Sequence, residues 1–307
     1  MNVPIEHQDQ AQTLRSRRGR PADGSQERQE KKRFTRVFSV TSGKGGVGKT
    51  AIVSNLAMVL AKKGKKVLVI DADLGLANID VIFGLAPRYN LNNFFNGEQS
   101  LRGIIADGPR GIKILPAGSG IQRFTHLDAG MKMHFLEELG TLHGEFDVVL
   151  IDTESGISEN VTYFNAAAQD ILVVTTPDPT AITDAYTLMK LLSTRYDQKQ
   201  FYLVVNFAGS SEEGLEVFQK LTMVSHRYLD ISIDFLGCIT ADKRMPEALR
   251  RQKTVVELYP GGRSSLAIES LANSLDSAPL RQQPKGTLQF FWKQFLGADG
   301  DLQTSGK

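Results

Sequence analysis

Short apolar runs alternate with amphipathic stretches along most of this chain. The runs are rich in Val, Ile and Leu and cover 37–42, 66–73, 111–118, 146–152, 170–177, 201–207 and 235–240. Continuous apolar runs of this kind are typical of strands that are buried on both faces. Apolar residues recur at helical spacing over 49–63, 130–143, 211–229 and 264–275. The alternation predicts an α/β fold with a doubly wound, mostly parallel sheet.

The two ends of the chain depart from this pattern. Residues 1–33 are polar and charged, and such a segment buries too little apolar surface to offset the entropy lost on ordering. We therefore expect a flexible N-terminal tail and a single domain over 34–276. Residues 277–286 contain Pro and Gln and are expected to form a linker, and 298–307 a second flexible tail.

Residues 287–297, between that linker and the last tail, are amphipathic. Apolar side chains fall at i, i+3, i+4, i+7 and i+8, and these are Leu288, Phe291, Trp292, Phe295 and Leu296. The spacing predicts a helix that lies in the plane of a membrane surface. The alternative is a helix that docks on its own domain. Lys293 is the one cation of the segment, so attraction to anionic lipid is a weaker part of the argument.

Composition excludes several classes of protein. A net charge of +2 is close to balanced, so nothing global demands nucleic acid. A single cysteine, Cys238, excludes intramolecular disulfides and a multi-cysteine metal site supplied by one chain. The chain has no run of about 18 apolar residues that could span a bilayer, and its polar N-terminus lacks the apolar core of a signal peptide. We expect a cytoplasmic protein that is peripheral on the inner face of the membrane.

The stretch GKGGVGKT at 43–50 follows the first apolar run and opens the first helix. Its glycines let backbone N–H groups converge on an anion at the positive end of that helix. In such a P-loop, Lys49 reaches the outer phosphates and the Thr50 hydroxyl binds Mg²⁺. A glycine-rich turn without a ligand is the alternative, but the order of strand, loop and helix favours phosphate binding. The expected contacts are Gly43, Lys44, Gly45, Gly46, Val47, Gly48, Lys49, Thr50 and Ala51.

Carboxylates end two of the apolar runs, at the edge where parallel sheets place their ligands. Asp152 ends 146–152, and we expect it to reach Mg²⁺ through the water shell of the metal. Asp71 and Asp73 end 66–73 and point the same way in an extended chain. Their like charges require a cation or a lysine nearby.

KGGVGKT, with Lys44 before the double glycine, resembles the deviant Walker A motif of the MinD/ParA family of P-loop ATPases. The resemblance implies an ATPase that dimerises around ATP and separates after hydrolysis, with Lys44 reaching the nucleotide of the partner. DADLGLANID at 71–80 is similar to the first switch of the family. This similarity implies that Asp73 orients the attacking water and that Asp71 supports the magnesium shell.

Two later segments extend the resemblance. Residues 178–186 are similar to a part of the dimer face in this family. Asn206 ends the run 201–207 and resembles the residue that reads the adenine ring, since an asparagine amide can match the donor and acceptor edge of adenine. Asp242 resembles, less specifically, a second wall of the base pocket.

One position departs from the family pattern. After Asp152 the family usually has small residues or proline, whereas this chain has Glu154 within 153–156. A carboxylate there adds negative charge near the expected γ-phosphate. Unless Glu154 points away or pairs with a lysine, we expect weaker ATP binding or an altered second switch.

DQAQTLR at 9–15 resembles the N-terminal segment of the FlhG/FleN family, the flagellar-number branch of the MinD group. In that family the segment binds the signal-recognition-type GTPase FlhF and stimulates its GTP hydrolysis. The resemblance implies an activator segment at 8–15, with Gln10 as the activating group and Leu14 and Arg15 as docking contacts. A solubilising tail is the alternative. Flagellar switch proteins or a transcription regulator are further partners that the resemblance implies, and no direct nucleic acid is expected.

Three other functions remain open. A division-site MinD would share the ATPase and the C-terminal helix but have no use for DQAQTLR. A ParA-type DNA-partition ATPase would need a basic dimer surface and bind DNA in a salt-sensitive way. A nucleotide-gated scaffold with little hydrolysis is the third, because of Glu154 and because Ala51 lacks the hydroxyl that many relatives offer to the α-phosphate.

Overall fold

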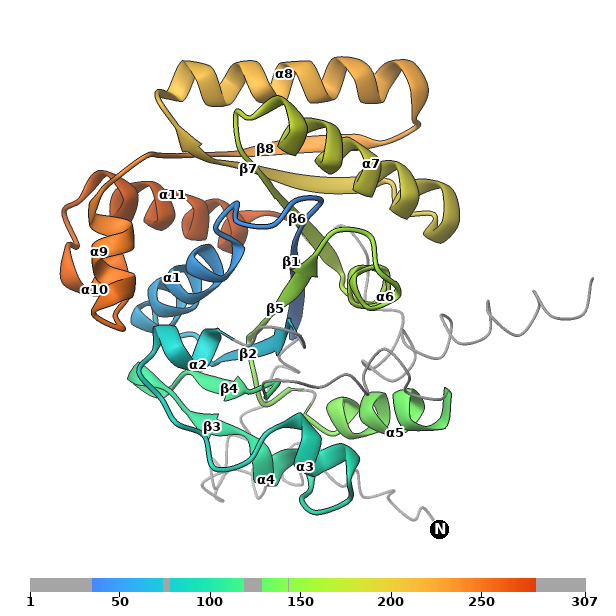
Figure 1. Cartoon of the computed structure of the whole chain (residues 1–307), viewed down its shortest axis with the longest axis vertical. Helices are drawn as coiled ribbons and strands as arrows, with labels where there is room; N and C mark the ends of the chain where they lie inside the picture. Colours follow the sequence, from blue (N-terminus) through green and yellow to red (C-terminus); the bar gives the residue numbers. More distant parts are fainter. Residues whose placement is uncertain (1–34, 74–77, 119–128, 143, 280–307) are drawn as a thin grey trace, which may run out of the picture. The chain divides into compact units, whose positions relative to one another are not determined.

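The computed structural model describes residues 35–73, 78–118, 129–142 and 144–279, which form one sheet with helices on both faces (Figure 1). The predicted activator segment at 8–15 and the predicted membrane helix at 287–297 lie outside these residues. The α/β class and the mostly parallel, doubly wound sheet are confirmed.

The sheet has eight strands in the order β3-β4-β2-β5-β1-β6-β7-β8. Only β3 and β4 pair antiparallel among the described strands, and every other neighbouring pair is parallel. The strands are β1 (Arg36–Ser42), β2 (Val67–Ala72), β3 (Ala106–Asp107), β4 (Lys113–Leu115), β5 (Val148–Ser155), β6 (Asp170–Thr175), β7 (Gln200–Ala208) and β8 (Ser232–Thr240). From β1, the chain adds β5, β2 and β4 on one side of the sheet and β6, β7 and β8 on the other. In doubly wound sheets, ligands bind at the point where the strand order reverses in this way.

Helices cover both faces because alternate residues of each buried strand point to opposite sides. On β5, Val148 and Leu150 face the cluster built by α1, α10 and α11, whereas Val149 and Ile151 face the cluster of α5 and α6. The helices are α1 (Lys49–Lys62), α2 (Ile79–Ile82), α3 (Leu91–Phe95), α4 (Leu101–Ile104), α5 (Ala129–Gly140), α6 (Glu159–Ala167), α7 (Pro179–Tyr196), α8 (Ser211–Tyr228), α9 (Arg244–Arg250), α10 (Val255–Leu258) and α11 (Arg263–Ser277), with a 3₁₀ turn η1 (Pro109–Gly111).

The described helices differ from the sequence prediction mainly where a helix is buried on all sides. Such a helix lacks the alternation of apolar and polar residues that marks helical spacing in a sequence. All residues of α6 from Asn160 to Ala167 are buried, so this helix has no polar stripe to mark it. In α5, Leu136 and Leu139 are buried at helical spacing, and Phe135, next to Leu136, is buried as well. The strand expected at 235–240 begins earlier, at Ser232. Within the described helices, none is long and apolar enough to cross a membrane.

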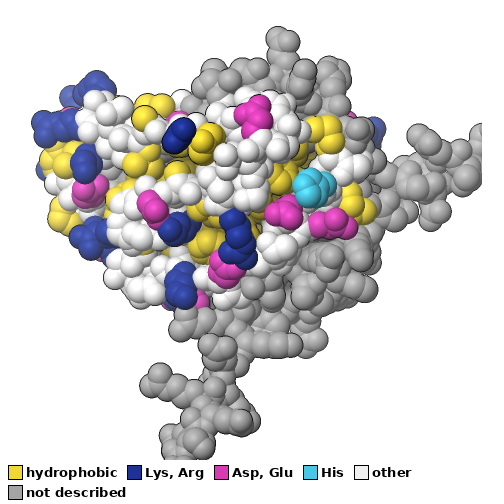
Figure 2. All heavy atoms as spheres, turned by 90° about the horizontal axis from the view of Figure 1, so that it is seen from below, with side chains coloured by type: hydrophobic (Ala, Val, Ile, Leu, Met, Phe, Trp, Pro, Cys, Tyr) yellow, Lys and Arg dark blue, Asp and Glu magenta, His cyan; other side chains and the backbone are white. Residues whose placement is uncertain are grey.

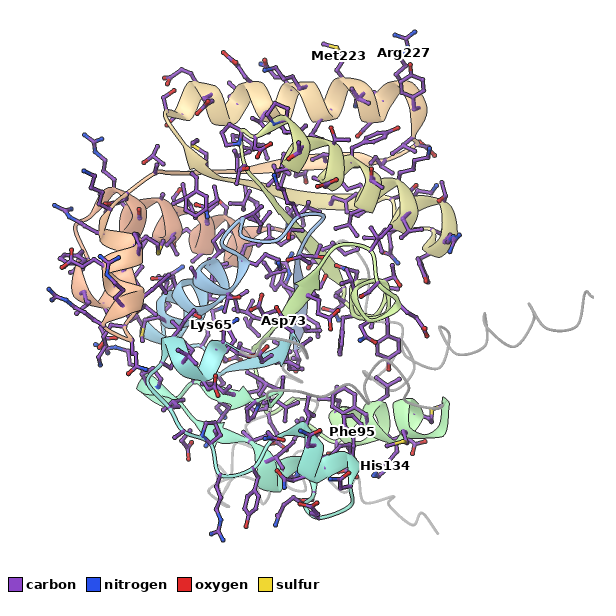
Figure 3. All side chains as sticks on the ribbon, in the orientation of Figure 1. Lys65, Asp73, Phe95, His134, Met223 and Arg227 are labelled. Carbon is purple, nitrogen blue, oxygen red and sulfur yellow. The ribbon has the colours of Figure 1, made fainter. Side chains whose placement is uncertain are left out.

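We predict that the packing of α1 against the sheet dominates stability. Leu56 in α1 is fully buried, so Leu56→Ala should lower the free energy of unfolding by about 2–5 kcal/mol. Met223 on α8 is 73% exposed and stands on the outer side of that helix in Figure 3, so Met223→Ala should change it by less than about 0.5 kcal/mol. Denaturant unfolding of the two variants measures both values, and equal losses would contradict the described core.

Candidate functional site

The loop between β1 and α1 is a backbone cradle that depends on its glycines. Gly46 and Gly48 have φ angles of 77° and 91°, which other residues adopt only with strain. A Cβ atom on Gly43 would lie 2.2 Å from the backbone oxygen of Asp184, and one on Gly48 would lie 2.4 Å from Asn206 Nδ2. The predicted loop therefore packs directly against the start of α7 and the end of β7, and side chains at these two positions would displace it.

Lys49, at the start of α1, is buried, with 6% of its surface exposed. Its Nζ donates to Ser42 Oγ at 3.0 Å and to Ser155 Oγ at 2.5 Å, so the lysine joins the ends of β1 and β5. Burial lowers the pKa of Lys49, and the negative charges of Asp152 and Asp73 act in the opposite direction. An ammonium held in this way is suited to bind an anion at the mouth of the loop.

Two buried carboxylates lie opposite each other on the paired strands β2 and β5. Asp71 and Asp152 are register partners, and each is 1% exposed. Burial raises the pKa of Asp71 to about 8, and the neighbouring charge of Asp152 adds to this effect. Burial likewise raises the pKa of Asp152 to about 7, against the opposing effects of the Thr50 hydroxyl and the Lys49 ammonium.

The surroundings of these two carboxylates differ. Asp71 accepts hydrogen bonds from the backbone N–H groups of Asp73 (3.2 Å), Asn78 (3.1 Å) and Ile79 (3.2 Å). It therefore holds both ends of the segment between β2 and α2, a contact that the sequence did not predict. Asp73 stands at the end of β2 near the centre of Figure 3, where its charge raises the pKa of Lys49 and of Asp152.

Asp152 fits a divalent cation. Neither of its buried oxygens has a hydrogen-bond partner among the described residues, and the Thr50 hydroxyl is close enough to lower its pKa. A carboxylate and a hydroxyl are the hard oxygen ligands that Mg²⁺ prefers, usually together with water and phosphate oxygens. The described part of the chain has no cluster of three or more His, Cys, Asp or Glu residues that would form an all-protein metal site. Asp152 and Thr50 thus offer two hard oxygen ligands, and the other ligands of a cation would come from water or from a bound anion.

Lys44 is held by its own chain. Its Nζ donates to Asp178 Oδ2 at 2.9 Å and to Thr180 Oγ1 at 2.5 Å, at the start of α7. Asp178 also caps α7, because its side chain accepts from the backbone N–H of Thr180. The hydrogen bond from Lys44 is the largest of the effects that hold the pKa of Asp178 below its usual range. The Lys44 side chain is 39% exposed, so it can leave this contact without a change in the core.

Asn206, at the end of β7, is buried beside the loop. Its Nδ2 donates to the carbonyl oxygen of Val47 at 2.8 Å, whereas no described residue donates to its buried Oδ1. The amide therefore keeps its acceptor and the second N–H of Nδ2 for a base. Adenine presents an amino donor beside a ring-nitrogen acceptor, and an amide acceptor beside an amide donor matches this edge.

Asp242 lies in the turn after β8, and its carboxylate already serves that turn. One oxygen accepts from the backbone N–H of Arg244 at 2.9 Å and the other from Ser264 Oγ at 3.1 Å. These bonds lower the pKa of Asp242. The contact of Asp242 with a base stays a prediction. It would use the lone pairs of the carboxylate that do not accept from Arg244 or Ser264.

Glu154 turns toward α6. Its carboxylate accepts from Ser158 Oγ at 3.2 Å, and Ser158 is the residue that caps that helix. A negative charge is favourable at a helix N-terminus. The structure thus gives Glu154 a partner away from the P-loop, and the residue that contacts Lys49 is its neighbour Ser155.

Phe207 is a site residue that the sequence did not reveal. It lies at a register shift between β7 and β8, has a φ of 57° and is 45% exposed. A left-handed conformation is rare for a bulky aromatic residue and costs free energy. Its ring lies 3.4 Å from the Cβ position of Gly48 and borders a hollow of about 440 Å³ between the P-loop and the residues 176–178. In the sequence, this residue is one more apolar position of a buried strand.

Comparison with known proteins agrees with this geometry. The ParA family model, described as NUBPL iron-transfer P-loop NTPase, matches residues 33–276. Antiactivator FleN of Pseudomonas aeruginosa is 41% identical over 260 residues, which are 85% of this chain and 93% of that protein. Flagellum site-determining protein YlxH of Helicobacter pylori is 34% identical over 85% of this chain and 90% of its own length.

A solved structure has the same fold. The septum site-determining protein MinD of Pyrococcus horikoshii, complexed with Mg-ADP, superposes with a TM-score of 0.66 at 25% identity, covering 79% of this chain and 96% of that one. Together with the P-loop, the buried carboxylates and the matches above, this shows that the chain belongs to the MinD/ParA family of P-loop ATPases, in its FleN/FlhG branch.

Proposed function

We propose that this chain is an ATPase that dimerises with ATP, associates with the cytoplasmic membrane and regulates the number and placement of flagella by stimulating an FlhF-type GTPase. The observation that carries the flagellar role is the likeness, over 85% of the chain, to FleN and to a relative named for determining the flagellum site. The complete P-loop site supports the ATPase part of the proposal.

The site residues have distinct roles in this proposal. Lys49 and the backbone of 43–50 bind the phosphates, and Asn206 Oδ1 accepts from the adenine amino group. Thr50 and Asp152 would hold Mg²⁺, which supplies electrostatic stabilisation of the phosphoryl oxygens. Asp73 orients the attacking water, and Asp71 supports the metal shell indirectly by fixing the backbone of Asp73.

Exposed apolar residues near the site support the proposed dimer. Ile157 is 52% exposed next to Ser155 and Gly156, and Val81 in α2 is 50% exposed. With Phe207, these apolar residues lie within eight positions of Asp73, Ser155 and Asn206 along the chain. A second copy would cover them, and in that complex Lys44 would leave Asp178 for the nucleotide of the partner. Two C-terminal helices in one dimer would also strengthen membrane binding by roughly 10²–10⁴ through avidity.

The structure bears on the alternative functions, which are a scaffold with little hydrolysis, a DNA-partition ATPase and a division-site ATPase. Glu154 is engaged at α6, which removes one reason to expect a scaffold with little hydrolysis. On the face shown in Figure 2, Asp and Glu side chains lie among the Lys and Arg side chains, so this face offers no uniform basic surface for DNA. Pairs such as Arg251–Glu247 and Lys253–Glu257 neutralise part of the positive charge. A division-site function differs from the proposal in having no use for residues 8–15.

The first prediction concerns ATP turnover with lipid vesicles at rising protein concentration. Asp73→Ala should lower kcat by about 10²-fold or more because the attacking water loses its orienting group. Trp292→Glu should abolish the stimulation by lipid, since it places a charge on the apolar face of the predicted helix. Gln289→Glu is the matched control on the polar face and should keep the stimulation. Turnover that is unaffected by lipid or protein concentration would contradict the membrane-dependent dimer.

A second prediction tests the activator segment. Wild-type protein should raise the GTPase rate of an FlhF-type protein, and Gln10→Ala should remove most of this stimulation. Gln12→Ala has the same change in the same segment and should retain it. Phosphate release from GTP, measured with each variant in excess, gives the rates. If Gln10→Ala stimulates as well as wild type, the segment has another role.

A third prediction concerns the cradle. Gly48→Ala should weaken ATP and ADP binding at least about tenfold, equal to about 1.4 kcal/mol, because the new Cβ displaces the Asn206 amide as well as straining the backbone. Gly46→Ala is the matched control, since Gly46 has a similar positive φ but open space around its Cβ position. Calorimetric titration should therefore show a smaller loss for Gly46→Ala. The reverse order would disprove the role of the contact with Asn206.

A further inference from the structure

Ser155 places a hydroxyl beside the P-loop from β5, whereas the P-loop itself follows β1. It is the last residue of β5, three positions after Asp152, and pairs in register with Ser42 of β1. Its Oγ lies 2.5 Å from Lys49 Nζ and 3.8 Å from the Cβ position of Gly45. The side chain therefore lies between the tip of Lys49 and the backbone of the loop.

The two serines that hold Lys49 differ in what they do with their own protons. A hydroxyl has one donor and two acceptor sites. Ser42 accepts from Lys49 and donates its proton to the carbonyl oxygen of Lys44 at 2.7 Å. Ser155 also accepts from Lys49, but none of the described residues accepts its proton. Since this oxygen accepts from the ammonium, the Ser155 proton is left for another acceptor.

Among the described contacts, Lys49 keeps one donor for a bound nucleotide. An ammonium has three donors, and Ser42 and Ser155 take two of them. The lysine of a P-loop reaches the β- and γ-phosphates, whereas the loop backbone cradles the α- and β-phosphates. A hydroxyl beside the tip of Lys49 is thus placed for the terminal phosphate of a triphosphate, which ADP lacks.

We propose that the Ser155 hydroxyl donates a hydrogen bond to the γ-phosphate of bound ATP and thereby favours ATP over ADP. A hydrogen bond to a charged oxygen is stronger than one between neutral groups. Ser42 cannot serve in this way, because its proton is committed to the loop itself. The inference rests on the ATPase activity of the family and not on the flagellar role.

The test compares the affinities of full-length variants for ADP and for a non-hydrolysable ATP analogue, both with Mg²⁺, by calorimetry. Ser155→Ala should weaken binding of the ATP analogue about tenfold or more and change ADP binding by less than about twofold. Ser155→Thr keeps the hydroxyl and should restore the preference. Ser277→Ala, at the end of α11, removes a hydroxyl that bonds only backbone oxygens of its own helix and should leave both affinities unchanged.

The outcomes separate this inference from the proposed ATP site. If wild-type protein binds neither nucleotide, the ATP site itself is wrong. If wild type binds both and Ser155→Ala weakens both equally, Ser155 acts only by placing Lys49, and the inference is overturned. An unchanged ratio in Ser155→Ala, or a loss of preference in Ser277→Ala, also overturns it. Thermal unfolding of each variant shows that the change in affinity does not come from loss of fold.

Discussion

The burial of Lys49 is the constraint on which the rest of the site depends. A charged ammonium in a protein interior is costly unless opposite charges and hydrogen bonds compensate it. Here the compensation comes from Asp152 and Asp73 and from the hydroxyls of Ser42 and Ser155. Ser42 lies in β1, Asp152 and Ser155 lie in β5, and Asp73 directly follows β2. The three strands lie side by side in the order β2-β5-β1. The order of the strands thus brings together the groups that stabilise buried Lys49, and Lys49 provides a positive charge at the P-loop.

The same edge must accommodate two buried carboxylates on adjacent strands. Asp71 and Asp152 are register partners, so their charges would repel if both were ionised. The fold treats them differently: three backbone N–H groups surround Asp71, and the oxygens of Asp152 stay without a partner among the described residues. Asp71 therefore holds the ends of the segment that follows β2, and Asp152 remains available to bind a cation. This division explains how a fixed core and an adaptable site share one sheet edge.

Much of this arrangement could be predicted from the sequence. The apolar runs predicted the strands, and GKGGVGKT predicted the loop, because both signals are local. The hydrogen bond between Asn206 and Val47 and the pair of Lys44 and Asp178 join residues that are 159 and 134 positions apart, so no local pattern indicates them. Helix α6 was missed because it is buried on all sides, and Phe207 because its role depends on a backbone shift in β7. The segments at 8–15 and 287–297 lie outside the described residues and stay predictions.

The contact of Lys44 with Asp178 bears on how ATP would drive the proposed dimer. An exposed ion pair contributes little to stability, so it is a weak lock on the monomer. A shift of a two-state equilibrium from 1:99 to 99:1 requires about 5.5 kcal/mol of differential binding. The free energy gained or lost when Lys44 leaves Asp178 is too small to supply this differential binding. In the proposed dimer the difference has to come from new contacts: Lys44 of each copy with the phosphates of the other, and burial of Val81, Ile157 and Phe207. Since the apolar contacts need no nucleotide, the phosphates must supply the part that makes association depend on ATP.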